Sequence, residues 1–243
     1  MARKRIDQLL VERGVFDSRA KARAAIEAGR VTVAGRAVAK PSESVDEAAE
    51  IVAEAAHPWV GRGALKLVHA LDLWPIAVEG RIAADIGAST GGFTEVLLSR
   101  GAAKVFAVDV GRDQLHAKLK ADDRVVDLSG VDARALDADT IPEAPMLVVS
   151  DVSFISLTKA LPAALGLAAP GADLVALIKP QFEAGREHVG KGGLVKDAEV
   201  IARVEREIVD FLEGAGWSAK GLAESPITGG EGQVERLVWA TKG

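Results

Sequence analysis

From Pro58 to the end of the chain, short apolar runs alternate with helix-like stretches. Such alternation predicts an α/β fold in which a mostly parallel sheet is covered by helices on both faces. Seven runs have the length and composition of strands, namely Ile82–Ile86, Val105–Asp109, Val125–Asp127, Met146–Asp151, Leu174–Lys179, Trp217–Ala223 and Leu237–Ala240. In a doubly wound sheet, ligands bind beyond the carboxyl ends of the strands. We therefore expect functional side chains at those ends.

A glycine-rich turn, Asp-Ile-Gly-Ala-Ser-Thr-Gly-Gly-Phe-Thr, follows the first of these strands and leads into a helix-like stretch. Glycine allows positive φ and close backbone approach, and the free N–H groups of a new helix face a ligand. Ser89 replaces the second glycine of the dinucleotide fingerprint, and Asp85 would repel a pyrophosphate but suits a cation. S-adenosylmethionine carries an ammonium and a sulfonium. We therefore predict a methyl-donor site formed by Asp85, Gly87, Ala88, Ser89, Gly91, Gly92 and Phe93, although similar loops also occur as purely structural βα turns.

Two further aspartates follow the next strands. Asp109 ends the second strand, where a carboxylate can accept the ribose hydroxyls of an adenosine. Its alternative role is to cap a helix beginning near Arg112. Asp132, after the third strand, either reaches the adenine or caps the segment from Ala133 onward. With the donor loop after the first strand, seven strands match the methyltransferase variant of the doubly wound fold.

The fourth and fifth strands end at Asp151 and Lys179. An unpaired lysine at the mouth of an apolar strand would be costly, so we expect Asp151 to pair with Lys179. A purely structural ion pair is the alternative. The segment Asp151–Phe154 lacks the prolines that methyltransferases acting on exocyclic amines carry here, so the methyl acceptor is not expected to be an amine.

Composition narrows the class of protein. The chain has 243 residues, 49% of them hydrophobic and 27% charged, as in soluble globular proteins. The absence of cysteine excludes disulfides, thiolate zinc sites and cysteine nucleophiles. No run is long enough to cross a membrane, and Met1–Asp7 lacks the apolar core of a signal peptide, so we expect a cytoplasmic protein.

Residues 1–45 carry a net charge of +5, whereas the whole chain carries −5. Apolar spacing predicts helices over Arg5–Arg13 and Arg19–Ala28, followed by a hairpin of Val31–Val33 and Arg36–Val38. The segment resembles the small RNA-binding module named after ribosomal protein S four, which implies binding of structured RNA. The candidate RNA-binding residues are Arg3, Lys4, Arg5, Arg19, Lys21, Arg23 and Arg30. A solvated basic face is the alternative. Residues 46–57, rich in alanine and acidic side chains, are predicted to be a linker to a catalytic domain over 58–243.

As a whole the chain resembles the TlyA family of ribosomal RNA ribose methyltransferases, some of which are labelled haemolysins. The matching segments are Trp59–Leu67, Asp85–Thr94, Asp151–Ser156, Lys179–Glu183, Gly192–Asp197 and Gly229–Arg236. The resemblance implies a catalytic domain similar to FtsJ-type ribose 2′-O-methyltransferases, with a catalytic tetrad of Lys66, Asp151, Lys179 and Glu235. It implies S-adenosylmethionine as cofactor, no metal, and cytidine ribose in ribosomal RNA as substrate.

Three segments depart from the family's pattern. Ala64 stands where the usual Arg-Gly-Gly-x-Lys has its second glycine. Gln233 stands where an asparagine is common, and residues 127–132 lack the family's Glu-Arg-Thr-Asn character. Three other functions remain as alternatives: a membrane-active haemolysin, a non-catalytic RNA-binding assembly factor, and a pseudouridine synthase. The absence of an amphipathic membrane hairpin disfavours the first, and the filled tetrad positions disfavour the second. The Gly-rich donor loop disfavours the third.

Overall fold

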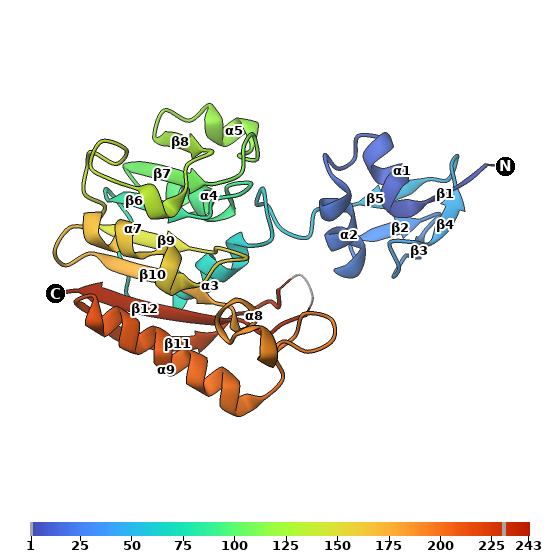
Figure 1. The fold of residues 1–243 in the computed structure, drawn as a ribbon. Helices are drawn as coiled ribbons and strands as arrows, with labels where there is room; N and C mark the ends of the chain where they lie inside the picture. Colours follow the sequence, from blue (N-terminus) through green and yellow to red (C-terminus); the bar gives the residue numbers. More distant parts are fainter. Residues whose placement is uncertain (1, 230–231) are drawn as a thin grey trace. The chain divides into compact units, whose positions relative to one another are not determined.

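The computed structural model describes residues 2–229 and 232–243, so residues 230 and 231 of the segment Gly229–Arg236 lie outside the described residues. Contacts between Cα atoms divide the chain into two compact units, Met1–Pro58 and Trp59–Gly243. We call these the first unit and the second unit. Figure 1 shows the elements of both along the chain.

The second unit is built on a sheet that has seven strands among the described residues, in the order β11-β12-β10-β9-β6-β7-β8. Pairing is parallel from β10 through β8, whereas β12 runs antiparallel to both β10 and β11. The strands are β6 Ile82–Ile86, β7 Lys104–Asp109, β8 Val125–Ser129, β9 Leu147–Ser150, β10 Asp173–Ile178, β11 Trp217–Glu224 and β12 Arg236–Lys242. Each overlaps a predicted strand, and the predicted fold class is confirmed.

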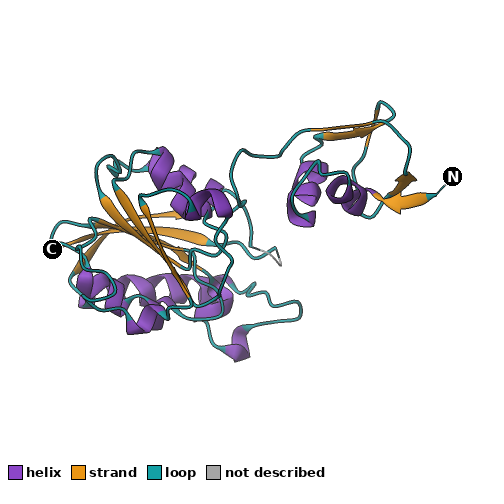
Figure 2. Ribbon diagram, turned by 90° about the horizontal axis from the view of Figure 1, so that it is seen from above, coloured by secondary structure: helices purple, strands orange, loops and turns teal. Residues whose placement is uncertain are grey.

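Alternate residues of the buried strands point into separate apolar cores on the two faces of the sheet. On β9, Val148 belongs to one core, whereas Leu147 and Val149 belong to the other. Helices α6, α7 and α9 pack on the Val148 side, and α3, α4 and α5 pack on the opposite side. Figure 2 shows helices on both faces of the twisted sheet.

The helices of the second unit begin and end where the sequence has caps and breakers. They are α3 Ala64–Leu73, α4 Gly92–Ser99, α5 Ala117–Lys120, α6 Leu157–Ala160, α7 Pro162–Leu167, α8 Pro180–Glu183 and α9 Ala198–Gly214, with short 3₁₀ turns at Ala133–Ala135 and Arg186–His188. The long helix α9 is preceded by Asp197, whose carboxylate accepts hydrogen bonds from the backbone N–H groups of Glu199 and Val200. Such a cap satisfies donors that have no partner inside the helix.

The first unit has its own apolar core around Ile6, Leu10 and Ile26. Its elements are β1 Arg3–Arg5, α1 Ile6–Glu12, α2 Arg19–Glu27, β2 Val31–Val33, β3 Arg36–Ala37, β4 Ser44–Asp46 and β5 Ile51–Ala53. Ser18 accepts a hydrogen bond from the backbone N–H of Lys21 and so caps α2, as predicted. The two helices and the hairpin of β2 and β3 thus follow the sequence prediction.

The predicted linker over residues 46–57 is wrong. Strand β4 pairs with β1, and β5 pairs with β2, so residues 44–53 are part of the first unit. Three-residue strands among acidic and alanine residues have too little periodicity to be recognised from sequence. With the boundary at Pro58, the first unit contains ten basic and nine acidic residues, a net charge of +1 rather than the +5 of residues 1–45.

Candidate active site

The loop between β6 and α4 passes so close to its neighbours that two positions require glycine. Gly87 has φ +86, and a Cβ there would lie 2.9 Å from Cγ1 of Val152. Gly91 has φ +93, and a Cβ there would lie 2.2 Å from Cδ1 of Leu119. The positive φ values and the absence of side chains let the loop pack against the loop after β9, at Val152, and against α5.

Beside this loop lies a cavity of about 560 Å³, which we call the donor cavity. Its volume is in the range of small-molecule sites. Of the predicted donor residues, Gly87, Ser89, Asp109 and Asp132 line it, whereas Asp85, Ala88, Gly91, Gly92 and Phe93 do not. The other lining residues, which the sequence did not single out for the donor, are Val108, Val110, Gly111, Gln114, Val131, Ala133, Arg134, Asp151, Val152, Ser153, Phe154, Ile155 and Ala160.

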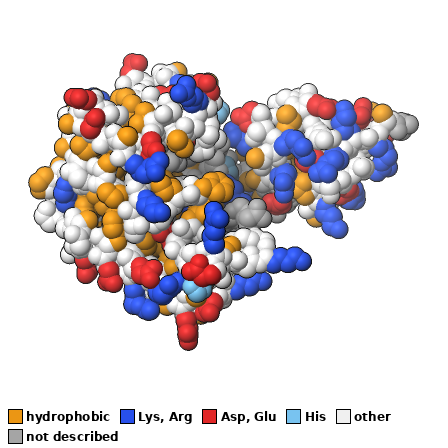
Figure 3. Space-filling view, in the orientation of Figure 1, with side chains coloured by type: hydrophobic (Ala, Val, Ile, Leu, Met, Phe, Trp, Pro, Cys, Tyr) orange, Lys and Arg blue, Asp and Glu red, His pale blue; other side chains and the backbone are white. Residues whose placement is uncertain are grey.

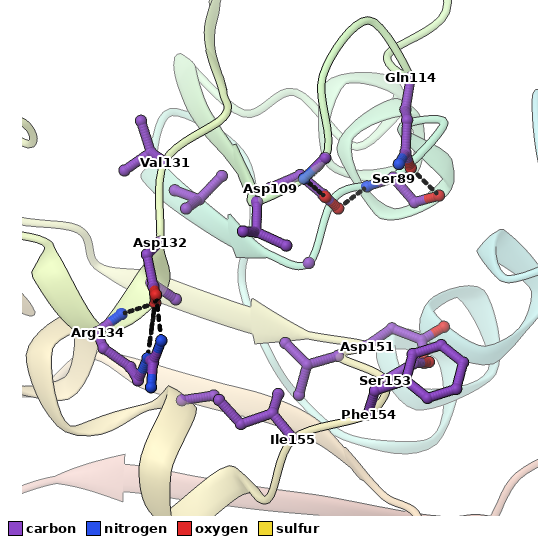
Figure 4. A pocket seen from close by; sticks show the side chains of 17 residues that line it. Ser89, Asp109, Gln114, Val131, Asp132, Arg134, Asp151, Ser153, Phe154 and Ile155 are labelled. Carbon is purple, nitrogen blue, oxygen red and sulfur yellow. Dashed lines mark hydrogen bonds and ion pairs between the residues drawn. The ribbon is translucent and has the colours of Figure 1, made fainter.

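Asp109 is held on the wall of the donor cavity by two backbone donors. Its Oδ2 accepts a hydrogen bond of 2.7 Å from the N–H of Ser89, and its Oδ1 accepts one of 2.7 Å from the N–H of Gly111. In the described chain the next helix begins at Ala117, so the alternative of a cap near Arg112 is wrong. A carboxylate has more acceptor positions than these two bonds use, and the remainder are available to hydroxyl donors. Figure 4 shows Ser89, Asp109 and Gln114 on one side of the cavity.

Asp132 combines the two roles that the sequence left open. It lines the donor cavity, and its Oδ1 accepts a hydrogen bond from the N–H of Arg134, which caps the 3₁₀ turn. The Arg134 guanidinium also binds this carboxylate, and its hydrogen bonds lower the pKa of Asp132 to about 2. The group is therefore ionised at neutral pH.

Asp85 does not face the donor cavity. It is fully buried, and its Oδ2 accepts hydrogen bonds from the N–H and the hydroxyl of Thr94, in the first turns of α4. The expectation that Asp85 contacts a cationic ligand directly is thus not matched by its position. Burial raises the pKa of Asp85 to about 7, because a carboxylate loses its hydration there.

The sheet topology brings the four predicted tetrad residues to one edge. Asp151 follows the end of β9, and Lys179 follows the end of its parallel neighbour β10. Glu235 precedes β12, which runs antiparallel to β10 with Arg236 opposite Ile178, so Glu235 lies at the same end. The first turn of α3 supplies Lys66.

The four side chains form one buried ionic network centred on Asp151. Lys179 Nζ lies 2.7 Å from Oδ1 of Asp151, and Lys66 Nζ lies 3.1 Å from its Oδ2. Lys66 Nζ also lies 2.7 Å from Oε2 of Glu235. Lys66, Lys179 and Glu235 are all buried. The formal charges of two ammonium and two carboxylate groups cancel, as burial requires. The predicted pairing of Lys179 with Asp151 is therefore present.

Two further side chains hold the loops that carry the tetrad. Gln233 is buried and accepts a hydrogen bond of 2.7 Å from the N–H of Val195, while its amide nitrogen donates to the carbonyls of Val195 and Val234. Glu183 accepts a hydrogen bond of 2.8 Å from the N–H of Leu157 and thereby ties α8 to α6. Burial raises the pKa of Glu183. Neither role was visible in the sequence.

A second cavity, of about 520 Å³, shares Arg134, Phe154 and Ile155 with the donor cavity and was also not predicted. Phe154 has φ +66 and is 90% exposed, and its ring centre lies 5.1 Å from that of Phe182. A left-handed backbone is strained for a bulky residue, and an exposed aromatic ring leaves apolar surface in water. The two together are a combination found at functional sites. The second cavity is also lined by three basic residues, Arg134, Lys159 and Arg186. Figure 4 shows Asp151, Ser153 and Phe154 together on one side of the donor cavity.

The predicted RNA-binding residues all lie in the first unit, and most of them pair with acidic side chains there. Arg5 and Arg19 both bind the buried carboxylate of Asp7, at 3.0 and 2.8 Å. Lys4, Lys21, Arg23 and Arg30 pair with Glu12, Asp17, Glu27 and Glu54, respectively, and Arg3 donates to the carbonyl of Ser44. Figure 3 shows basic side chains interleaved with acidic ones on this unit.

Neither a metal site nor a membrane span is found in the part of the chain that the structure describes. No three His, Asp or Glu side chains there are arranged to hold a metal ion. None of the described helices combines the length and the apolar character that a membrane crossing needs.

Comparison with known proteins finds similarity over both units. The FtsJ-like methyltransferase family matches residues 59–242, and the S4 domain matches residues 4–51. The 16S/23S rRNA (cytidine-2′-O)-methyltransferase TlyA of Mycobacterium tuberculosis is 47% identical over 242 residues, which is 98% of this chain and 90% of the relative. Hemolysin A of Brachyspira hyodysenteriae is 38% identical over 96% of this chain and 98% of its own length. A solved structure named as a haemolysin from Streptococcus thermophilus has a TM-score of 0.78 and 41% identity, covering 100% of this chain and 89% of its own.

Proposed function

The chain belongs to the FtsJ-like methyltransferase family, and from this premise we propose that it methylates the 2′-hydroxyl of a cytidine ribose in ribosomal RNA. The methyl group comes from S-adenosylmethionine. The observation that carries the proposal is the buried network of Lys66, Asp151, Lys179 and Glu235 at the edge of the donor cavity. The curated relative named above as a cytidine 2′-O-methyltransferase supports cytidine as the target nucleoside.

The donor cavity fits an adenosine-containing sulfonium. Asp109 has acceptor positions left for the ribose hydroxyls, and Val110, Val131 and Ile155 offer apolar surface for a flat ring. When bound, S-adenosylmethionine supplies an electrophilic methyl group on its sulfonium. We assign to Gly87 and Ser89 the backbone surface next to it.

The acceptor is a weak acid, because a ribose hydroxyl does not ionise freely at neutral pH. As the oxygen takes the methyl group, its proton passes to the carboxylate of Asp151, which lines the donor cavity, and partial negative charge develops on the oxygen. The ammonium of Lys179 donates a hydrogen bond to this oxygen and stabilises the charge in a water-poor site. Asp151 fixes the direction of Lys179 through the 2.7 Å contact. Lys66 and Glu235 hold Asp151 in turn, so that the oxygen, methyl carbon and sulfur can align.

The second cavity offers a place for the target nucleotide. Unstacked RNA bases bind on aromatic rings, and phosphates bind basic side chains. Phe154 and Phe182 supply the rings, while Lys159 and Arg186 supply the charges. Because Phe154 also lines the donor cavity, a base held there lies next to the methyl donor.

The first unit is an S4 domain, and we assign the positioning of structured RNA to it. Its net charge of +1 is small, so binding depends on local donors such as Arg5 and Arg19 rather than on overall charge. Because ribosomal RNA is its proposed substrate, we expect the protein to act in the cytoplasm. The name haemolysin, which some relatives carry, has no counterpart among the residues of the site, whereas the ionic network beside the donor cavity supports group transfer.

The direct test is to incubate ribosomal subunits with the purified protein and S-adenosylmethionine and to map the modified nucleotide by mass spectrometry of RNA fragments. We expect methylation of a cytidine ribose. A methyl group on a base, or unmodified RNA of both subunits, would contradict the proposal. A liposome-leakage assay with the same preparation serves as the control for membrane activity, which we expect to be absent.

A further inference from the structure

Three oxygen atoms already surround the ammonium of Lys179. An ammonium group has three N–H donors. In this structure Nζ lies 2.7 Å from Oδ1 of Asp151, 2.9 Å from Oγ of Ser153 and 3.4 Å from the carbonyl oxygen of Asp151. A ribose hydroxyl can therefore bind Lys179 only if one of these acceptors gives way.

Ser153 contacts both Lys179 and the donor cavity. It lines that cavity, whereas Lys179 does not, and Lys179 is 6% exposed. The serine hydroxyl is thus bound to the lysine on one side and borders the methyl-donor space on the other. This is the position that an acceptor oxygen must occupy during methyl transfer.

We propose that the hydroxyl of Ser153 holds the place of the substrate's 2′-hydroxyl on Lys179 in the RNA-free enzyme and rotates away when RNA binds. The proposal rests on the proposed function and adds to it a residue that controls access to the lysine. Ser153 is a place-holder, not a chemical participant.

Physical reasons favour Ser153 as the acceptor that leaves. The ion pair with Asp151 cannot be broken without leaving a buried charge unpaired, which costs more than giving up the single hydrogen bond to the serine hydroxyl. The carbonyl of Asp151 is fixed by the backbone of the loop. A serine side chain, in contrast, changes between staggered rotamers by turning a single bond. The hydroxyl therefore keeps Lys179 satisfied without RNA and competes with the substrate for it.

The test is Ser153→Ala in the full-length protein, assayed by steady-state methyl transfer to ribosomal subunits. Removing the competing hydroxyl should raise kcat/KM for RNA roughly three- to tenfold, mainly through a lower KM, because one hydrogen bond to a charged group no longer has to be exchanged. Ser153→Thr keeps the hydroxyl but stiffens its rotation, and it should lower kcat/KM. Titration with S-adenosylmethionine alone should give the wild-type affinity for both variants.

Ser150→Ala is the matched control, because Ser150 is buried at the end of β9, just before the loop that carries Ser153, and its hydroxyl has no hydrogen-bond partner among the described residues. It should leave kcat/KM unchanged, and an equal rise in this variant would overturn the role of Ser153. A kcat/KM of Ser153→Ala at or below the wild-type value would overturn it as well, as would a fully active Ser153→Thr. A wild-type protein that leaves ribosomal RNA unmethylated would instead contradict the proposed function.

Discussion

At the scale of single residues, one carboxylate organises the site. Asp151 accepts Lys179 on one oxygen and Lys66 on the other, and Glu235 gives Lys66 a second acidic partner. Loss of either lysine therefore leaves Asp151 with a cationic partner. This redundancy means that substitution of Lys179 should affect chemistry more than folding.

Phe154 provides a prediction about substrate binding. If its exposed ring stacks with the target base, Phe154→Ala should lower kcat/KM for RNA roughly tenfold or more, since stacking on an aromatic is worth about 1–3 kcal/mol per base. Because the ring is 90% exposed, the melting temperature should not fall. Phe154→Tyr keeps the ring and should retain most of the activity. An unchanged kcat/KM in the alanine variant would remove Phe154 from the nucleotide site.

Asp85 provides a prediction about pH and stability. Burial raises the pKa of Asp85 from an ordinary value of 3.8 to about 7, so the folded form keeps a proton that the unfolded chain releases. The stability that this proton contributes is complete below pH 4 and is lost as the pH rises through 7. The melting temperature of the wild type should therefore fall by several degrees between pH 5 and 8, relative to Asp85→Asn. If the melting temperatures of the two proteins change in parallel between pH 5 and 8, Asp85 is ionised over that whole range and the prediction is wrong.

At the scale of elements, the sequence predicts the strands of the large sheet, but it does not predict the short strands β4 and β5 or the second cavity. Buried parallel strands are unbroken apolar runs, so β6 through β10 were visible in the sequence. Strands β4 and β5 were missed because three residues show no clear period, and pairing of distant segments decides them. The tetrad was predicted from family resemblance, and its residues do meet. The second cavity was not predicted, because Phe154 and Phe182 come together only through packing.

Gln233 provides a prediction at this scale. Its amide joins Val195 to the segment that carries Glu235, so Gln233→Ala would leave two backbone groups of Val195 without partners. We expect a destabilisation of about 1–3 kcal/mol and a lower kcat, with unchanged affinity for S-adenosylmethionine. Val234→Ala, at the partly exposed neighbouring position, is the control. Full activity of Gln233→Ala would show that Glu235 does not depend on this link.

At the scale of the whole molecule, each unit has its own apolar core, and the boundary lies at Pro58. Deleting residues 1–58 should therefore leave donor binding intact and weaken binding to ribosomal subunits at least tenfold, because phosphate contacts of the first unit are lost. Affinity measured at two salt concentrations should show a smaller salt dependence for the deletion. Deleting only residues 1–45 should lower solubility more than deleting residues 1–58, because β5 would remain without its pairing partner β2. Equal ribosome affinity after deletion of 1–58 would contradict the role of this unit.

The most direct test of the central claim concerns Lys179. Lys179→Ala and wild type should be compared in two measurements on the same preparations, a calorimetric titration with S-adenosylmethionine and a single-turnover assay of ribose methylation. Because Lys179 does not line the donor cavity, donor affinity should stay within about twofold, whereas methyl transfer should fall at least about a hundredfold with the loss of charge stabilisation. Methylation at a near wild-type rate in Lys179→Ala would contradict the account.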